Sequence, residues 1–291
     1  MAASKTANAE TDVDANVPAQ RLTLSLIEAP RPVLPVGSPA VSVIIPTKNE
    51  ALNLPWVFSR LPEGLAEVIV VDGASTDDTI EVAQRLCPDV MITPQTRAGK
   101  GNALACGLAE ATGDILVTLD ADGSADPHEI VAFVQALLDG ADFAKGTRFL
   151  PGGGSADITR IRKLGNDVLA RLVNHLYQVD YTDLCYGFNA FWRHCLPYLD
   201  LPSTSCARPM HGDGFEIETL INVRVAMSEL NVVEVPSFEA PRIHGSSNLN
   251  AFRDGLRVLK TIAQERRLSK ETPNLDEPPV PYPVIDLTVM P

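Results

Sequence analysis

Two acidic residues one position apart, Asp120 and Asp122, directly follow an apolar run of β-forming residues that ends at Leu119. Gly123 completes this stretch. Carboxylates at the exposed end of a buried strand can bind a ribose hydroxyl and a hard divalent cation, Mg²⁺ or Mn²⁺, which often bridges substrate phosphates. The spacing therefore predicts a site for a metal ion and a diphosphate at this point of the chain.

The ends of two earlier apolar runs carry the same kind of side chains. Pro46, Thr47 and Glu50 follow the first run, and Asp72 ends the second. Each stretch taken alone also suits a turn or a helix cap, because Asp, Asn, Ser and Gly favour those positions. All three stretches, however, fall at one edge of a predicted sheet and supply oxygen ligands. A shared ligand site is therefore the stronger interpretation.

The elements that must position these residues are short apolar runs alternating with helical patterns. Runs that are almost continuously apolar are typical of strands buried on both faces of a parallel sheet. In such a βαβα order the carboxyl ends of the strands share one edge, where open α/β sheets bind ligands. The predicted strands span residues 41–46, 67–73, 89–93, 114–122 and, later in the chain, 231–237.

Five helical patterns accompany these strands. We expect Ser75 or Thr76 to be the N-cap of the first of them. The third has the apolar residues Ile161, Leu164, Val168, Leu172 and Leu176 at helical spacing. The predicted helices span residues 75–86, 101–113, 157–178, 212–227 and 250–267.

Composition predicts one folded α/β domain at residues 39–268. A hydrophobic content of 45% in 291 residues is enough for a substantial core. The segments 1–38 and 269–291 bury too little apolar surface to offset the entropy of ordering, and the second is rich in Pro and acidic residues. We therefore expect these two segments to be disordered tails.

The net charge and the cysteines limit which functions and which cellular compartment are compatible with this sequence. A formal net charge of −13 argues against a general nucleic-acid or anionic-membrane binder, so any phosphate site must be local. Five cysteines without a CxxC pair indicate reduced thiols. The sequence has neither a signal-peptide pattern nor an apolar run of membrane-spanning length. We expect a cytoplasmic protein, with the inner face of the membrane as the alternative if its substrate is a lipid.

Four stretches at plausible spacing resemble the successive motifs of a known enzyme family. They are "VSVIIPTKNEALNL", "VIVVDGASTDDTIEVA", "RAGKGNALACGLAEATGDILVTLDADGSADPHEI" and "YTDLCYGFNAFWR". They resemble the motifs of family 2 glycosyltransferases of the GT-A fold, most of all the polyprenyl-phosphate (dolichol-phosphate) mannosyl- and glucosyltransferase branch. The resemblance covers residues 41 to 249 and implies a Rossmann-like, mostly parallel mixed sheet flanked by helices, with a nucleotide-sugar half at 39–123 and an acceptor half at 124–268.

The resemblance implies a function and a donor site. The function is metal-dependent, inverting transfer of a hexose from GDP-mannose or a UDP-hexose to polyprenyl phosphate, with Mg²⁺ or Mn²⁺ as the cofactor. An Asp-Gly in the second loop, where many relatives have Asp-Asp, leaves the base open between uracil and guanine. The nucleotide-sugar-binding residues would be Pro46, Thr47, Glu50, Asp72, Lys100, Asp120, Asp122, Gly123 and Arg242.

The resemblance also implies catalytic, metal and acceptor residues. Asp122 and Asp183 would be catalytic, with Asp183 positioning a phosphate acceptor or acting as a base for an alcohol acceptor. Asp122 and His244 would hold the metal. Of two acids on a later helix we favour Glu216 over Glu218, because only one can face inward. Cations at a helix start oppose the helix dipole and so indicate an anionic partner; Arg148, Arg160 and Arg162, with Lys163 nearby, would bind the acceptor phosphate.

Alternatives remain open at this point. The same donor chemistry could serve a soluble acceptor such as a phosphoglycerate, a metabolite or a natural-product aglycone. The last helix, with Phe252, Leu256, Leu259 and Ile262 among basic residues, suits either a membrane-surface helix or a helix packed on its own domain. A nucleotide-sugar-binding protein without turnover is a further alternative. So is a nucleotidyltransferase, although "PTKNEALN" lacks the glycine-rich phosphate loop.

Overall fold

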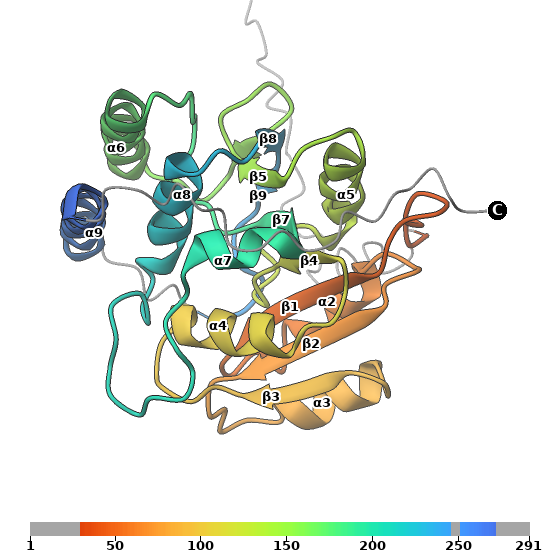
Figure 1. Ribbon diagram of the computed structural model, residues 1–291. Helices are drawn as coiled ribbons and strands as arrows, with labels where there is room; N and C mark the ends of the chain where they lie inside the picture. The colour runs from red at the N-terminus through yellow and green to blue at the C-terminus, as the bar shows by residue number, and fades with distance from the viewer. Residues whose placement is uncertain (1–29, 246–250, 272–291) are drawn as a thin grey trace, which may run out of the picture. The chain divides into compact units, whose positions relative to one another are not determined.

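The computed structural model describes residues 30–245 and 251–271 (Figure 1). Most of the two predicted tails therefore lies outside the described residues. The described chain forms a seven-stranded sheet in the order β3-β2-β1-β4-β7-β5-β8 and a two-stranded sheet, β6-β9. The strands are β1 Val41–Thr47, β2 Glu67–Asp72, β3 Met91–Pro94, β4 Ile115–Thr118, β5 Phe143–Thr147, β6 Gly154–Ser155, β7 Asn189–Trp192, β8 Val232–Pro236 and β9 Phe238–Glu239.

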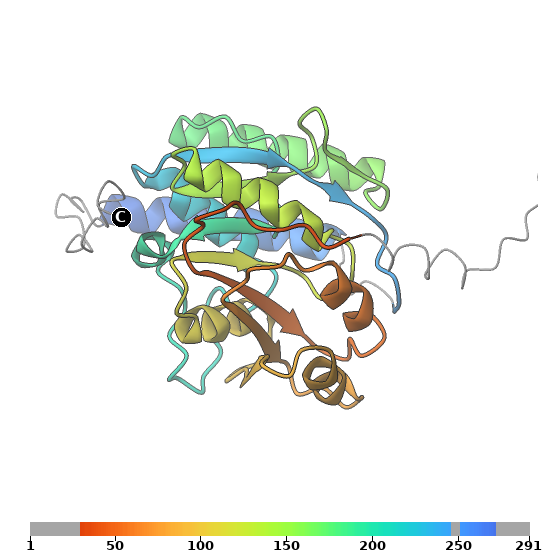
Figure 2. The same cartoon turned by 90° about the vertical axis from the view of Figure 1, so that its right-hand side faces the viewer.

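Helices lie on both faces of the large sheet, as two views of the ribbon show (Figures 1 and 2). One apolar core contains residues of α2, α3 and α5, and another contains residues of α4, α7 and α8. The helices are α2 Leu54–Arg60, α3 Thr79–Leu86, α4 Lys100–Glu110, α5 Ile130–Leu138, α6 Arg160–Tyr177, α7 Leu196–Leu199, α8 Ile217–Met227 and α9 Ala251–Glu271, with short 3₁₀ turns η1 Pro127–Glu129 and η2 Arg193–Cys195.

The sheet is mixed and mostly parallel, as predicted. β1 pairs in parallel with β2 and β4, and β5 pairs in parallel with β8, whereas β7 runs antiparallel to both β4 and β5. Alternate residues of β1 enter opposite cores: Val43 and Ile45 join one and Ile44 joins the other. This double burial explains why the strand is apolar at nearly every position. The register pairs Thr47 with Asp72, so the polar strand ends do meet at one edge.

A third apolar cluster joins α6, α8 and α9. Val258 and Ile262 of α9 are buried in it, so the last helix packs on its own domain, yet Leu256 and Leu259 remain 69% and 44% exposed. The apolar residues at helical spacing on α6 mostly face solvent rather than the core. Exposed on this helix are Ile161 at 67%, Leu164 at 64% and Val168 at 55%.

Several local predictions differ from the structure; for example, α8 begins at Ile217 rather than at residue 212. The N-cap of α3 is Asp78, not Ser75 or Thr76. Ser75 instead accepts a hydrogen bond from the backbone N–H of Asn49, which ties the second loop to the first. Contacts with the domain begin at Arg31, before the expected boundary at residue 39, because Arg31 Nε donates to the Leu61 carbonyl. Among the described residues, no helix has both the length and the apolar composition needed to cross a membrane.

Candidate active site

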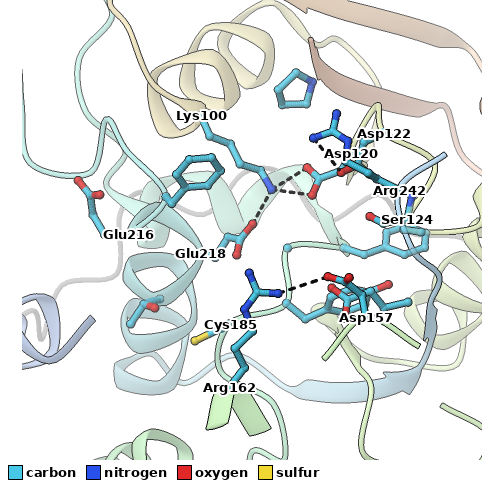
Figure 3. Close-up of a pocket in the computed structure, with 18 of the residues that line it drawn as sticks. Lys100, Asp120, Asp122, Ser124, Asp157, Arg162, Cys185, Glu216, Glu218 and Arg242 are labelled. Carbon is cyan, nitrogen blue, oxygen red and sulfur yellow. Dashed lines mark hydrogen bonds and ion pairs between the residues drawn. The ribbon is translucent and has the colours of Figure 1, made fainter. Parts of the chain in front are cut away.

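A cavity of about 880 Å³ lies at the polar edge of the sheet and collects most of the predicted site residues (Figure 3). Asp72, Gly123, Arg160, Asp183 and His244 are not part of its lining. The predicted residues that do line it are Pro46, Thr47, Glu50, Lys100, Asp120, Asp122, Arg148, Arg162 and Arg242.

The turn after β4 presents the acid pair to the cavity. Asp122 Oδ1 accepts a hydrogen bond from the backbone N–H of Ser124 at 3.0 Å, which closes a tight turn. Gly123 has a φ of +76°, and a Cβ there would lie 2.4 Å from Ile243 Cδ1. Glycine is therefore required at this position both by the backbone conformation and by the close packing.

Lys100 lies between two carboxylates from distant parts of the chain (Figure 3). Its Nζ is 2.6 Å from Asp120 Oδ1 and 2.5 Å from Glu218 Oε1. Burial alone would lower the pKa of Lys100, but these two acids raise it above its ordinary value, so the ammonium stays charged. Burial raises the pKa of Glu218. The three side chains form a partly buried ionic cluster with one cation and two acids.

The expectation that only one of Glu216 and Glu218 can face inward is wrong, because both line the cavity. α8 begins at Ile217, so Glu216 is its N-cap residue. The Glu216 carboxylate accepts hydrogen bonds from the backbone N–H groups of Gly212 and Gly214 and points away from Lys100, although it also lines the cavity (Figure 3). Glu218, two residues further along the chain, is the acid that forms an ion pair with Lys100.

The loop that carries Lys100 is held by an ion pair that sequence reasoning missed. Arg97 Nη2 is 2.7 Å from Asp213 Oδ1, and both side chains are almost fully buried. The carbonyl of Asp213 also accepts a hydrogen bond from Gly101 N–H at 2.8 Å. Nothing in the spacing could reveal this pair, because its members lie 116 positions apart.

The segment after β1 forms an ion pair and hydrogen bonds with residues 242–244. Arg242 Nη2 is 2.7 Å from Glu50 Oε1. Asn53 accepts from the backbone N–H of His244 and donates to its carbonyl. Arg242 is thereby held beside Asp122, with 4.0 Å between Nη1 and Oδ2. This arrangement places a cation and an acid together on the cavity wall.

The two predicted metal ligands lie on neighbouring segments, because the backbone N–H of Ile243 donates to the Asp122 carbonyl, and their role in holding a metal stays a prediction. His244 is exposed and lies outside the cavity lining, whereas Asp122 is on the wall. Within residues 30–245 and 251–271, no group of three or more His, Cys, Asp or Glu side chains is arranged to hold a metal ion. Asp122 offers a hard oxygen ligand that suits Mg²⁺ or Mn²⁺, and a nucleotide diphosphate would have to supply further oxygens.

Asp183 does not line the cavity itself but binds Arg148, which does. Its carboxylate is fully buried and binds Arg148 with two oxygens, at 2.7 Å to Nε and 3.0 Å to Nη2. Glu239 binds the other side of Arg148 at 3.0 Å. Burial would raise the pKa of Asp183, but the bonds and charge of Arg148 hold it below its ordinary value. Asp183 is therefore a weak base, placed to orient Arg148.

The other cations predicted to bind the acceptor phosphate lie at the start of α6, and they do not all face the cavity. Arg162 lines the cavity and pairs with Asp157 at 3.3 Å (Figure 3). Arg160 is exposed and does not line it. Lys163 pairs with Asp167 on its own helix. Only one member of this run thus faces the site.

Asp72 shapes the second loop. Its carboxylate is largely buried and accepts a hydrogen bond from the backbone N–H of Ser75. The role of Asp72 in meeting the base stays a prediction.

The mostly parallel sheet and the Asp-x-Asp turn after β4 are the arrangement expected of a GT-A glycosyltransferase. The sequence model of "Glycosyl transferase family 2" matches residues 42–196, so the chain belongs to family 2 and is a glycosyltransferase. The family prediction is thereby confirmed, and so is the predicted fold.

Curated relatives come from archaea and bacteria. Glycosyltransferase AglJ of Haloferax volcanii is 34% identical over 226 residues, covering 74% of this chain and 68% of the relative. Dolichol-phosphate mannosyltransferase of Pyrococcus furiosus is 32% identical, covering 81% of this chain and 65% of the relative. Polyprenol monophosphomannose synthase of Mycolicibacterium smegmatis is 32% identical, covering 72% and 80%. The chain thus spans about two thirds of the length of the first two relatives.

Among solved structures, the chain resembles glucosyl-3-phosphoglycerate synthase from Mycobacterium tuberculosis in complex with Mn²⁺, UDP-glucose and phosphoglyceric acid. The sequence identity is 25% and the TM-score 0.58, with 82% of each chain covered.

Proposed function

We propose that this glycosyltransferase moves a hexose from a nucleotide sugar, GDP-mannose or a UDP-hexose, to polyprenyl phosphate, with inversion and with Mg²⁺ or Mn²⁺. The observation that carries the proposal is the extent of the cavity. One wall holds Asp120 and Asp122, and another is made by Ile161 and Arg162 of α6 and by Val258 of α9. A charged donor site therefore continues into a surface that is both apolar and basic, as an amphiphilic phosphate would require.

The two helices at this end differ in charge from the rest of the chain. The α6 sequence has four cationic residues and one acid, and the α9 sequence has six cationic residues and three acids, although the whole chain carries −13. Exposed apolar side chains stand among these cations: Ile161 and Leu164 on α6, and Leu256 on α9. Such a surface suits peripheral contact with a membrane that presents the lipid phosphate.

The state of Asp183 favours a phosphate acceptor over an alcohol. An alcohol must lose a proton as it attacks, and a carboxylate whose pKa is held low by Arg148 is a poor acceptor for that proton. A phosphate already carries an anionic oxygen, so it needs orientation rather than deprotonation. Asp183 would supply that orientation by holding Arg148 at the cavity wall.

The donor side follows from the acid pair. A divalent metal, when bound, would neutralise charge on the leaving diphosphate. Asp122 would hold this ion, and Asp120 would meet the ribose. Lys100 keeps Asp120 in place through its 2.6 Å ion pair. Arg242, tied to Glu50, would face the diphosphate from the opposite loop.

A soluble phosphate-bearing acceptor is the second candidate. It is supported by the likeness to the synthase structure that contains phosphoglyceric acid, at 25% identity. Both candidates use the same donor site and differ only in what enters between α6 and α9.

The test is a matrix of donors and acceptors with purified full-length protein and Mn²⁺. Labelled GDP-mannose, UDP-glucose and UDP-N-acetylglucosamine would each be offered with short polyprenyl phosphate in detergent or with 3-phosphoglycerate. Label entering the organic phase supports the proposal, and transfer only to 3-phosphoglycerate supports the second candidate. Failure to turn over any donor would contradict both.

A surface variant sharpens this test. Ile161→Glu should reduce transfer to polyprenyl phosphate in vesicles without reducing donor affinity, because it places a charge on the proposed lipid-facing surface. Leu86→Glu, on α3, places the same charge at another exposed aliphatic residue and should leave transfer unchanged. Equal loss in both variants would argue against a lipid surface at α6.

A further inference from the structure

A fully buried lysine on β5 faces a glutamate on β8. Lys145 is 0% exposed, and its Nζ is 3.2 Å from Glu234 Oε1. The two residues are direct partners in the register of β5 and β8. A buried charge is expensive unless it is paired and hydrogen-bonded, so the placement of such a pair calls for an explanation.

Apart from a 3.4 Å hydrogen bond from Lys145 Nζ to the Gly146 carbonyl, the other contacts of this pair go to three consecutive residues, 181–183. Glu234 accepts hydrogen bonds from Thr182 N at 3.0 Å, Thr182 Oγ1 at 2.7 Å and Asp183 N at 3.3 Å. Lys145 Nζ donates to the Asp183 carbonyl and lies 5.2 Å from the centre of the Tyr181 ring. The pair thus binds both the N–H and the C=O of Asp183, which fixes the position and rotation of its backbone.

The orientation of Asp183 decides that of Arg148. With its backbone held by the pair, Asp183 directs both carboxylate oxygens at the guanidinium. The Arg148 guanidinium also lies 5.0 Å from the centre of the Tyr186 ring, and both residues line the cavity. A shift of segment 181–183 would therefore move a cation on the cavity wall, although neither Lys145 nor Glu234 lines that wall.

We propose that Lys145 and Glu234 are positioning residues for the acceptor. Through Asp183 they set Arg148 for an acceptor phosphate, whether it comes from a lipid or from a soluble metabolite. This inference rests on the proposed function in one respect, that the acceptor carries a phosphate. A purely structural pair would contribute to stability and leave the acceptor affinity of the folded enzyme unchanged.

The test compares three variants with the wild type: Glu234→Gln, Lys145→Met, and the double variant, which removes both charges and keeps the pair's approximate volume. Donor affinity is measured by titrating the nucleotide diphosphate with Mn²⁺. Acceptor affinity is measured by titrating farnesyl phosphate or 3-phosphoglycerate onto the donor complex, and by the acceptor KM of whichever compound turns over. The matched control is Arg224→Met with Glu265→Gln, which removes a buried ion pair between α8 and α9.

Each of the three variants should weaken acceptor binding and raise the acceptor KM by about tenfold or more, with donor affinity unchanged. The double variant is decisive, because it removes the buried uncompensated charge and so keeps the protein folded. Wild-type acceptor affinity in the double variant would overturn the inference, as would an equal loss in the control. A wild type that turns over donor but binds neither phosphate would overturn both the proposed acceptor class and this inference. If the wild type is active and the double variant keeps its acceptor affinity, only this inference is overturned and the proposed function is not.

Discussion

Replacing Lys100 by methionine should show how much this cation contributes to holding Asp120 and Glu218 together in the donor site. Lys100 is the cation shared by Asp120 and Glu218, and its side chain is only 12% exposed. Methionine keeps a chain of similar length and removes the charge. Two carboxylates then remain close together on the cavity wall, where they repel each other and a bound diphosphate.

The magnitude follows from burial. Breaking a buried ion pair by removing one partner costs about 3–5 kcal/mol. Asp120 is 37% exposed in its side chain, so water screens part of its share, whereas Glu218 is 16% exposed. We therefore expect Lys100→Met to lower the free energy of unfolding by about 2–3 kcal/mol at neutral pH. Donor affinity should fall by about tenfold or more, since two unbalanced acids face the diphosphate.

The loss should depend on pH in a defined direction. Burial already raises the pKa of Glu218, and removal of Lys100 raises it further. A carboxyl group with a raised folded-state pKa adds stability that is present below its unfolded pKa and disappears as pH rises through the folded value. The variant should therefore recover part of its deficit as the pH is lowered from neutral, because Glu218 takes up a proton.

Denaturant unfolding at several pH values, with nucleotide titrations, is the assay. The double variant Lys100→Met with Glu218→Gln should be about 1–2 kcal/mol more stable than the single variant at neutral pH. Lys163→Met, which removes a half-exposed lysine on α6, serves as the control and should change neither quantity. A deficit that is constant across pH, or a double variant no better than the single one, would refute the reasoning.

Four further outcomes follow from single residues. Gly101→Ala should destabilise the protein by about 2–4 kcal/mol in a thermal or denaturant melt, because its Cβ would lie 1.7 Å from the Gly212 carbonyl oxygen. Gly165→Ala, in open space on α6, should instead stabilise it by about 0.5–1 kcal/mol. Asp122→Asn should abolish turnover while the fold is kept, as should a chelator added to the wild type. The pKa of Asp183 is lowered, so its carboxylate stabilises at neutral pH and this contribution is lost as pH falls through the folded-state pKa; the stability gap between Asp183→Asn and the wild type should shrink in acid.

The sheet was predictable because its strands obey a local rule. Continuous apolar runs predicted β1 at 41–46, where the structure has Val41–Thr47, and β2 at 67–73, where it has Glu67–Asp72. Burial on both faces leaves no room for polar alternation, so the signal is strong in a single sequence. The polar ends of these strands marked the ligand edge for the same reason, since nothing in the core would select them.

The same reasoning could not say which helix faces are covered. Ile161 and Leu164 repeat at helical spacing, but both are more than half exposed. The buried face of α6 includes Asn166, whose amide donates to the Thr182 carbonyl and accepts from Leu184 N–H. A polar residue can occupy a core position when the backbone beside it supplies partners. The backbone that supplies these partners to Asn166 belongs to a loop more than ten positions later in the chain. The periodicity of residues within α6 carries no information about that loop.

The choice between Glu216 and Glu218 shows where local reasoning ends. Two acids two positions apart cannot both face inward within one helix, but α8 begins at Ile217, so Glu216 lies just outside it and both acids line the cavity. At the N-cap, the Glu216 carboxylate accepts hydrogen bonds from the backbone N–H groups of Gly212 and Gly214 in the preceding loop. Glu218 is left as the partner of Lys100, so a one-residue difference in helix start selects the acid of the ionic cluster.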